Sequence, residues 1–204
     1  VYKRQYIFIM EDNMTISFED KVVIITGAGG GLGRSHALEF AKRGAKVVVN
    51  DLGGSVDGSG GSSEAANNVV KEITDAGGTA IPNGSSVTDD TGVKNMIDQT
   101  MDEFGRIDIL INNAGILRDK SFSKMTMEDF TIVTDIHLMG SVKPTKMVWE
   151  IMKEQNYGRI LVTTSSTGLY GNFGQSNYGA AKLGVVGFVN CLLYTSPSPR
   201  DALE

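Results

Sequence analysis

Short apolar runs rich in valine and isoleucine alternate along the chain with longer stretches in which apolar residues recur at helical spacing. The short runs predict strands at Val22–Thr26, Lys46–Asn50, Thr79–Pro82, Ile107–Asn112 and Arg159–Thr163. The longer stretches predict helices over Leu32–Arg43, Glu64–Asp75, Asp89–Phe104, Met127–Lys153 and Tyr178–Leu192. Strands that are apolar throughout and separated by helices are typical of a parallel sheet covered on both faces. The pattern therefore predicts an α/β fold with a doubly wound parallel sheet of the Rossmann type.

One domain accounts for the middle of the 204-residue chain, and we expect it to cover residues 14–193. The two ends, residues 1–9 and 194–204, have no hydrophobic period. The terminal sequences VYKRQ and LLYTSPSPRD resemble translated sequencing-adapter tails, so we expect both ends to be non-native. Within the domain, Pro144 is expected to kink or split the longest helix. Cys191 is expected to be a small buried hydrophobic residue.

The composition narrows the classes of partner. The chain has 19 basic and 24 acidic residues, and its net charge of −5 argues against a nucleic acid or an anionic membrane. A single cysteine excludes an intrachain disulfide, and with only 2 histidines it argues against a metal site. No apolar run approaches the roughly 18 residues of a membrane span. Nothing indicates export, so the cytoplasm is the default location. Glycine, with 25 residues, is about 12% against roughly 7% on average, which indicates tight turns or backbone close to a ligand.

A glycine-rich loop follows the first predicted strand and opens the first predicted helix. Gly27 would allow the tight turn, Gly31 would let the backbone approach a pyrophosphate, and Gly33 would let helix and strand pack closely. The helix N-terminus, including Leu32, offers free N–H groups and a positive dipole end to phosphates. Alone, this motif equally fits a structural turn, but a strand before it and a helix and strand after it favour a dinucleotide site.

An acidic residue ends the second predicted strand. Asp51 lies about 18 residues beyond Gly33, close to the spacing of the acid that binds ribose hydroxyls in dinucleotide sites. A carboxylate there would accept hydrogen bonds from the ribose and repel a 2′-phosphate. No basic residue closely follows Asp51, and Gly30 leaves no basic side chain in the loop, so NAD is favoured over NADP. The alternative is that Asp51 is only a strand-end turn residue.

Three further residues indicate proton chemistry. Tyr178 and Lys182 are four residues apart on a predicted helix and therefore share one face. A cation beside a phenol stabilises the phenolate and suits it to general acid/base catalysis. Such a pair alone is mostly surface decoration. Here a nucleotide loop lies upstream, and Ser165 lies shortly before the tyrosine, so the pair is interpreted as part of a catalytic centre.

These motifs together resemble the short-chain dehydrogenase/reductase family, over about Phe18 to Leu192. The segments that carry the likeness are TGAGGGLG, NNAG, Ser165 and Tyr178-x-x-x-Lys182. A narrower likeness, to the (3R)-hydroxyacyl-CoA dehydrogenase branch of the peroxisomal multifunctional enzymes type 2 and their bacterial relatives, is carried by VVVNDLGG, NNAGILRD and GLYGNFGQSNYGAAK. The peroxisome is therefore the alternative location.

The resemblance implies a role for each motif residue. Tyr178 would transfer the proton, Lys182 would hold the nicotinamide ribose and tune the tyrosine, and Ser165 would hydrogen-bond the substrate oxygen. The nicotinamide of NAD would carry the hydride. The residues implied to line the cofactor, besides the glycine loop and Asp51, are Ser86, Val87, Asn113 and Gly115.

Several positions depart from the family pattern or leave alternatives open. His137 occupies a place where many members carry an asparagine that holds a proton-relay water, and it is either a relay or a packed helix histidine. Ser86 stands where many members have aspartate. Residues 118–120, Arg-Asp-Lys, form either a phosphate contact or a solvated loop. The family continues with two more strands and substrate-covering segments, so the domain is expected to be truncated at its C-terminus. The long helices are expected to pair in a homo-oligomer.

The sequence thus predicts an NAD-dependent oxidation of a secondary alcohol to a ketone. The favoured small-molecule substrate is a 3-hydroxyacyl-CoA, by resemblance. One alternative is a dehydrogenase of the same family that acts on a steroid or a small alcohol. The other is a dinucleotide-sensing module without turnover, which would not need Ser165, Tyr178 and Lys182.

Overall fold

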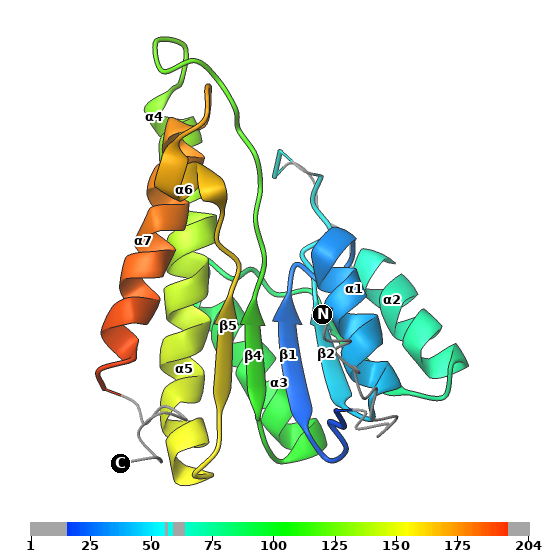
Figure 1. Ribbon diagram of the computed structural model, residues 1–204. Coiled ribbons are helices and arrows are strands. Elements are labelled where there is room, and N and C mark those ends of the chain that lie inside the picture. Colours follow the sequence, from blue (N-terminus) through cyan, green and yellow to red (C-terminus); the bar gives the residue numbers. More distant parts are fainter. Residues whose placement is uncertain (1–15, 56, 59–63, 196–204) are drawn as a thin grey trace, which may run out of the picture.

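The centre of the molecule is a five-stranded parallel sheet (Figure 1). The computed structural model describes residues 16–55, 57–58 and 64–195, so the proposed tail 1–9 and all but the first two residues of the proposed tail 194–204 lie outside the described residues. The strands are β1 (Val22–Thr26), β2 (Lys46–Asn50), β3 (Thr79–Asn83), β4 (Ile109–Asn112) and β5 (Arg159–Val162). Their order in the sheet is β3-β2-β1-β4-β5, with every neighbouring pair parallel. The predicted doubly wound sheet is confirmed.

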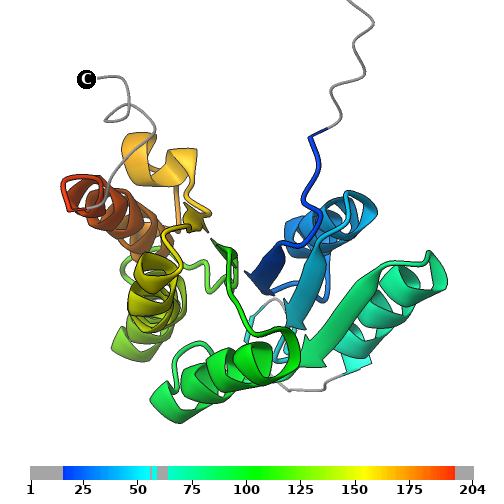
Figure 2. The same cartoon turned by 90° about the horizontal axis from the view of Figure 1, so that it is seen from below.

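Helices cover both faces of this sheet (Figure 2). On one face lie α1 (Gly31–Lys42) and α2 (Glu64–Asp75), and on the other lie α3 (Asp90–Phe104) and α5 (Gly140–Glu154). The helices α4 (Met127–Thr134), α6 (Ser166–Tyr170) and α7 (Ser176–Leu192) lie together beside β5 and α5 (Figure 1). None of the helices in the described part of the chain is long and apolar enough to cross a membrane.

The pleat of the central strands divides the core into two layers. Val23 and Ile25 of β1 point to one layer, where they pack with alanines of α1 and with Ile73 of α2. Ile24 points to the other layer, where it meets Met96 of α3. Because both faces of β1 are buried, every one of its side chains is apolar or, at Thr26, hydrogen-bonded. This two-sided burial explains why the strands could be predicted from continuous apolar runs.

The longest predicted helix is interrupted, but not at its proline. A π-helical segment, Asp135–Met139, separates α4 from α5, and Pro144 lies inside α5. The expected break at Pro144 is therefore wrong. Proline has no N–H to donate to the carbonyl one turn before it, and α5 contains it without a break. Single π turns inside helices often lie at functional sites.

The environment expected for Cys191 is also wrong. Its side chain is exposed in the last turn of α7. The buried residues of α7 lie in the first ten positions of the helix, where it packs against α4 and the π-helical segment. The sheet, by contrast, covers little of the C-terminal half of α7, so residues there have no core to enter.

Candidate active site

The loops that leave the carboxyl ends of the strands meet above β1 and β4, where ligands bind in open α/β sheets (Figure 1). Asn113, directly after β4, joins these loops. Its backbone N–H donates to Thr26 Oγ1 at 3.0 Å, and its side-chain amide donates to the carbonyls of Thr26 and Gly27, both at 3.1 Å. The Thr163 hydroxyl, after β5, donates to Asn113 Oδ1 at 3.3 Å. Asn113 therefore lies against the glycine loop and fixes its start.

The glycine loop is close-packed except at Gly30 and Gly31, and a Cβ on Gly29 would lie 2.7 Å from Ala65 Cβ. Gly27 has a φ of +64°, and a Cβ on it would lie 2.7 Å from Ala114 Cα. A Cβ on Gly33 would lie 2.1 Å from the Gly27 carbonyl oxygen. At Gly30 and Gly31 a Cβ would meet nothing within 4 Å. The loop is thus held tightly while its middle stays open to a ligand.

The first turn of α1 faces this open space. Leu32 is 65% exposed, so its side chain contributes little to the core, and its predicted contribution to cofactor binding rests on its backbone N–H. The first N–H groups of a helix have no partner within the helix. Gly31, Leu32 and Gly33 lie at this end of the helix, where the sequence predicts phosphate binding.

Asp51 lies at the glycine loop, as the sequence predicted. One carboxylate oxygen accepts a hydrogen bond from the Gly29 N–H at 2.8 Å, and the other accepts from the Gly53 N–H at 2.7 Å. The carboxylate is thereby turned toward the loop. The bond to Gly53, two residues on, is that of a strand-end turn residue, and the bond to Gly29 places the same carboxylate at the loop.

Ser86 and Val87 follow β3 at the same edge of the sheet. The Ser86 hydroxyl lies 2.9 Å from Thr88 Oγ1 and accepts from the Thr88 N–H at 3.3 Å. Val87 is buried against Gly140 at the start of α5, where a Cβ would come within 2.7 Å of it. The two residues form a packed edge next to the Asp51 end of the glycine loop.

Tyr178 and Lys182 lie on one face of α7, with the Lys182 ammonium 5.5 Å from the centre of the tyrosine ring. Lys182 is only 3% exposed, and its ammonium donates to the Thr163 carbonyl at the end of β5. Burial lowers the pKa of Lys182 to about 8. Ser165 caps α6, which packs against α7, and its hydroxyl accepts from the Thr167 N–H at 3.2 Å.

His137 lies in the π-helical segment, with its ring edge-on to Tyr178 at 5.0 Å between centroids. The ring is 4% exposed, and its Nε2 lies 2.8 Å from the Ile116 carbonyl oxygen and 3.1 Å from the Ile116 nitrogen. Gly115 makes room for it, because a Cβ there would lie 2.2 Å from His137 Cε1. Burial, and secondly the Lys182 cation, lower the pKa of His137 to about 4. The His137 ring is thus packed edge-on to Tyr178, and its lowered pKa favours the neutral form.

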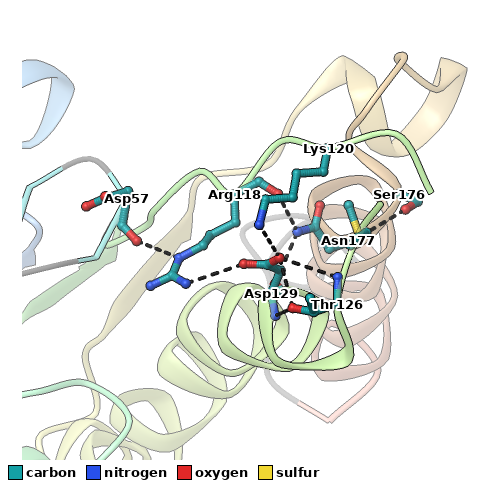
Figure 3. Close-up of polar contacts among 8 residues, drawn as sticks. Asp57, Arg118, Lys120, Thr126, Asp129, Ser176 and Asn177 are labelled. Carbon is teal, nitrogen blue, oxygen red and sulfur yellow. Dashed lines mark hydrogen bonds and ion pairs between the residues drawn. The ribbon is translucent and has the colours of Figure 1, made fainter. Parts of the chain in front are cut away.

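The structure adds a protein partner to residues 118–120, which the sequence interpreted as a phosphate contact or a solvated loop. Arg118 and Lys120 pair with the buried carboxylate of Asp129 in α4, at 3.3 and 2.8 Å (Figure 3). Asp119 and Lys120 are exposed, as expected of a solvated loop, but the two basic side chains also bind a carboxylate that the sequence did not indicate. Sequence reasoning also missed Asn177, which is fully buried beside Tyr178. Asparagine at a helix start is a capping signal that could have indicated it.

The glycine positions yield a paired test. Gly33→Ala forces a Cβ against the Gly27 carbonyl, so we expect it to destabilise the chain by about 3 kcal/mol, the upper range for overpacking. Gly30→Ala enters open space with an extended backbone and should change the free energy of unfolding by less than about 0.5 kcal/mol. Urea unfolding without cofactor measures both. Equal losses in the two variants would contradict the packing described for the loop.

The buried His137 predicts a pH-dependent stability. In the unfolded chain its pKa is about 6.5, whereas the folded value is about 4, so the unfolded state binds more protons between these values. Stability is complete above about pH 6.5 and falls as the pH drops toward 4. Relative to His137→Asn, the wild-type chain should lose about 2 kcal/mol between pH 7 and pH 5, measured by urea unfolding. Parallel losses in both proteins would show that the folded histidine titrates normally.

Comparison with known proteins shows which family shares these features. The family model for short chain dehydrogenases matches residues 21–195. The "Peroxisomal multifunctional enzyme A" of Dictyostelium discoideum is 59% identical over 88% of this chain and 40% of its own length. A short-chain type dehydrogenase/reductase of Mycobacterium tuberculosis is 52% identical over 85% of this chain and 61% of its own length.

A solved structure agrees with the sequence relatives. A 7α-hydroxysteroid dehydrogenase, complexed with NADH and 7-oxo glycochenodeoxycholic acid, superimposes with a TM-score of 0.80 at 31% identity. The match covers 88% of this chain and 66% of that one. The chain thus spans 40% and 61% of the two curated relatives described, and the resemblance to the multifunctional enzymes and bacterial relatives is confirmed. The chain belongs to the short-chain dehydrogenase family.

Proposed function

We propose that this chain is the NAD-binding and catalytic part of a dehydrogenase that oxidises a secondary alcohol to a ketone, with a 3-hydroxyacyl-CoA as its favoured substrate. The observation that carries the proposal is the pair of Tyr178 and the buried Lys182 on one face of α7. A buried lysine is costly unless it serves a purpose, and here it is aimed at the tyrosine ring and the end of β5. A sensing module without turnover has no need of this pair.

The residues perform the proton chemistry of the proposed reaction. Tyr178 accepts the proton of the substrate hydroxyl as the ketone forms, and the Lys182 cation stabilises the negative charge on the phenol oxygen. The Ser165 hydroxyl donates a hydrogen bond to the substrate oxygen. The neutral His137 ring keeps the tyrosine ring in place without adding charge. NAD, when bound, accepts the hydride.

The glycine loop and Asp51 fit a dinucleotide without a 2′-phosphate. The close packing at Gly27 and Gly33 leaves the middle of the loop open for a pyrophosphate. The Asp51 carboxylate lies at this loop and would exchange its bonds to Gly29 and Gly53 for ribose hydroxyls. Its negative charge disfavours the phosphate of NADP. Ser86, Val87, Asn113 and Gly115 complete the proposed cofactor site.

The proposed substrate class rests on the multifunctional-enzyme likeness, whose relatives are named as peroxisomal or come from bacteria. The peroxisome and the cytoplasm are the two proposed locations. A steroid alcohol is the second candidate substrate, because the structural neighbour with a TM-score of 0.80 is a hydroxysteroid dehydrogenase. We also propose a homo-oligomer formed through the long helices, where Met127 and Met139 are exposed.

Removal of the Tyr178 hydroxyl tests the reaction. In the full-length protein, Tyr178→Phe should lower turnover about 100-fold or more, the usual contribution of general acid/base catalysis, while NAD still binds. NAD reduction is followed with (3R)- and (3S)-hydroxyacyl-CoA and with a 7α-hydroxysteroid. Tyr157→Phe, at the opposite end of the sheet, is the matched control. Undiminished turnover in Tyr178→Phe would refute the mechanism, and activity on the steroid alone would refute the favoured substrate.

Cofactor choice is tested at Asp51. Asp51→Asn removes the charge that binds the ribose and repels a 2′-phosphate, so NAD affinity should fall about 10-fold, the value of one charge-assisted hydrogen bond. The preference for NAD over NADP should shrink with it. Titration calorimetry of both dinucleotides against both proteins measures the effect. A wild-type protein that binds NADP as tightly as NAD would contradict the proposal.

A further inference from the structure

The loop after β4 is tied to the start of α7 and the turn before it by three consecutive residues, and Figure 3 shows the bond between Asn177 and Arg118. Each residue of the 118–120 segment makes one hydrogen bond to residues 174–177. The bonds join Asn177 Nδ2 to the Arg118 carbonyl at 3.1 Å, Gln175 Nε2 to Asp119 Oδ2 at 2.7 Å, and Lys120 N to the Gly174 carbonyl at 2.9 Å. The segment therefore acts as a brace between the two loops, and we call residues 118–120 the brace.

Asp129 binds the two basic side chains of the brace. Its carboxylate accepts from Lys120 Nζ at 2.8 Å, from Arg118 Nη1 at 3.3 Å and from the Thr126 hydroxyl at 2.9 Å. The hydrogen bond from Lys120, together with those from Thr126, holds the pKa of this carboxyl well below its usual range. The anionic form of the group is thus favoured. Both cations of the brace are directed inward to it.

Asn177 connects the brace to the catalytic helix. Its side chain is fully buried and donates to the carbonyls of Arg118 and Asp129, at 3.1 and 3.2 Å. Its Oδ1 accepts from the Tyr178 N–H at 2.8 Å. This N–H belongs to the first turn of α7, where N–H groups have no partner within the helix. Gln175, which precedes the helix, makes no capping bond with its side chain.

Lys182 is held by other groups. Its ammonium donates to the Thr163 carbonyl, and its own carbonyl accepts from the Thr164 hydroxyl at 2.8 Å. The second turn of α7 is therefore anchored to the end of β5, whereas the first turn is anchored to the brace through Asn177. If the first turn frays, Tyr178 moves while Lys182 stays in place.

We propose that Asn177 is a positioning residue that sets Tyr178 against Lys182, and that Asp129 and the brace hold Asn177 in place. The role of the tyrosine in this inference rests on the proposed function. Asn177 touches neither substrate nor cofactor in this scheme. It acts through the main chain of the residue that follows it, so its loss should lower the rate of the chemical step more than the affinity for NAD.

The chain offers a matched control for an amide side chain that bonds the main chain. Gln155 accepts from the Ile107 N–H at 3.0 Å and donates to the Ile107 carbonyl at 2.7 Å, at the opposite end of the sheet. Asn177→Ala in the full-length protein should lower kcat about 10- to 100-fold, as expected when a reacting group is displaced by about 1 Å. The dissociation constant for NAD should change less than about 2-fold. Gln155→Ala should lose thermal stability but keep its kcat.

Comparison with the Gln155→Ala control shows whether Asn177 positions Tyr178 or only stabilises the fold. Equal losses of kcat in Asn177→Ala and Gln155→Ala, or an unchanged kcat in Asn177→Ala, would overturn the proposal. If Asn177→Ala does not fold, Asp129→Asn replaces it, because that variant keeps the size and the main-chain carbonyl of Asp129. It should lower kcat in the same direction with NAD affinity retained, and an unchanged kcat would again overturn the proposal.

A second readout does not need turnover. Fluorotyrosine is incorporated at the 6 tyrosines, and the NMR signal of Tyr178 is assigned by its loss in Tyr178→Phe. Asn177→Ala should shift or broaden this signal, and Gln155→Ala should leave it unchanged. An unaltered Tyr178 signal in Asn177→Ala would overturn the inference even if the wild-type protein oxidised none of the alcohols. A shifted signal without any wild-type turnover would instead refute the proposed function and leave the positioning role supported.

Discussion

A continuous series of contacts through Asn113 connects the two halves of the site. Its amide donates to the carbonyls of Thr26 and Gly27, which begin the glycine loop, and its Oδ1 accepts from the Thr163 hydroxyl. The carbonyl of the same Thr163 receives the Lys182 ammonium. The proposed phosphate-binding loop and the proposed catalytic lysine therefore share one scaffold of main-chain carbonyls across three strand ends. A change at Asn113 would therefore disturb both.

On the Tyr178 side of the site, a glycine leaves the space that the ring of His137 occupies. Gly115 lacks the Cβ that would overlap the His137 ring, and the ring then lies against Tyr178. The π-helical turn that carries His137 shifts the register of the long helix, so α4 and α5 present different faces. A histidine in this place stays neutral because burial and the nearby Lys182 disfavour its cation. It can therefore pack against Tyr178 without placing a second positive charge beside it.

The sequence predicted well those features that depend on local pattern. The five strands follow from two-sided burial, and the spacing of Gly33, Asp51 and the Tyr178–Lys182 pair follows from the backbone geometry of a strand-loop-helix unit. The sequence-based prediction failed for features that depend on contacts between residues far apart in the chain. Pro144 indicated a break that occurs at 135–139, and the charges at 118–120 were interpreted without knowledge that Asp129 would lie beneath them. Asn177 was not singled out, because the partners of its amide N–H groups are main-chain carbonyls far away in the chain.

The kind of partner that holds each group also determines how the site responds to its surroundings. Lys182 and Asn177 are bound by main-chain carbonyls, whose charge and position do not change with pH. Asp129 is bound by two cations, which favour its anionic form and hold its pKa well below the usual range. Lys182 differs from these groups, because burial lowers its pKa to about 8 and its charge therefore depends on pH. Tyr178, the proposed proton-transferring residue, thus lies between a lysine whose charge varies with pH and a helix turn whose position does not, and a fixed position is what the proposed acid/base catalyst requires of its support.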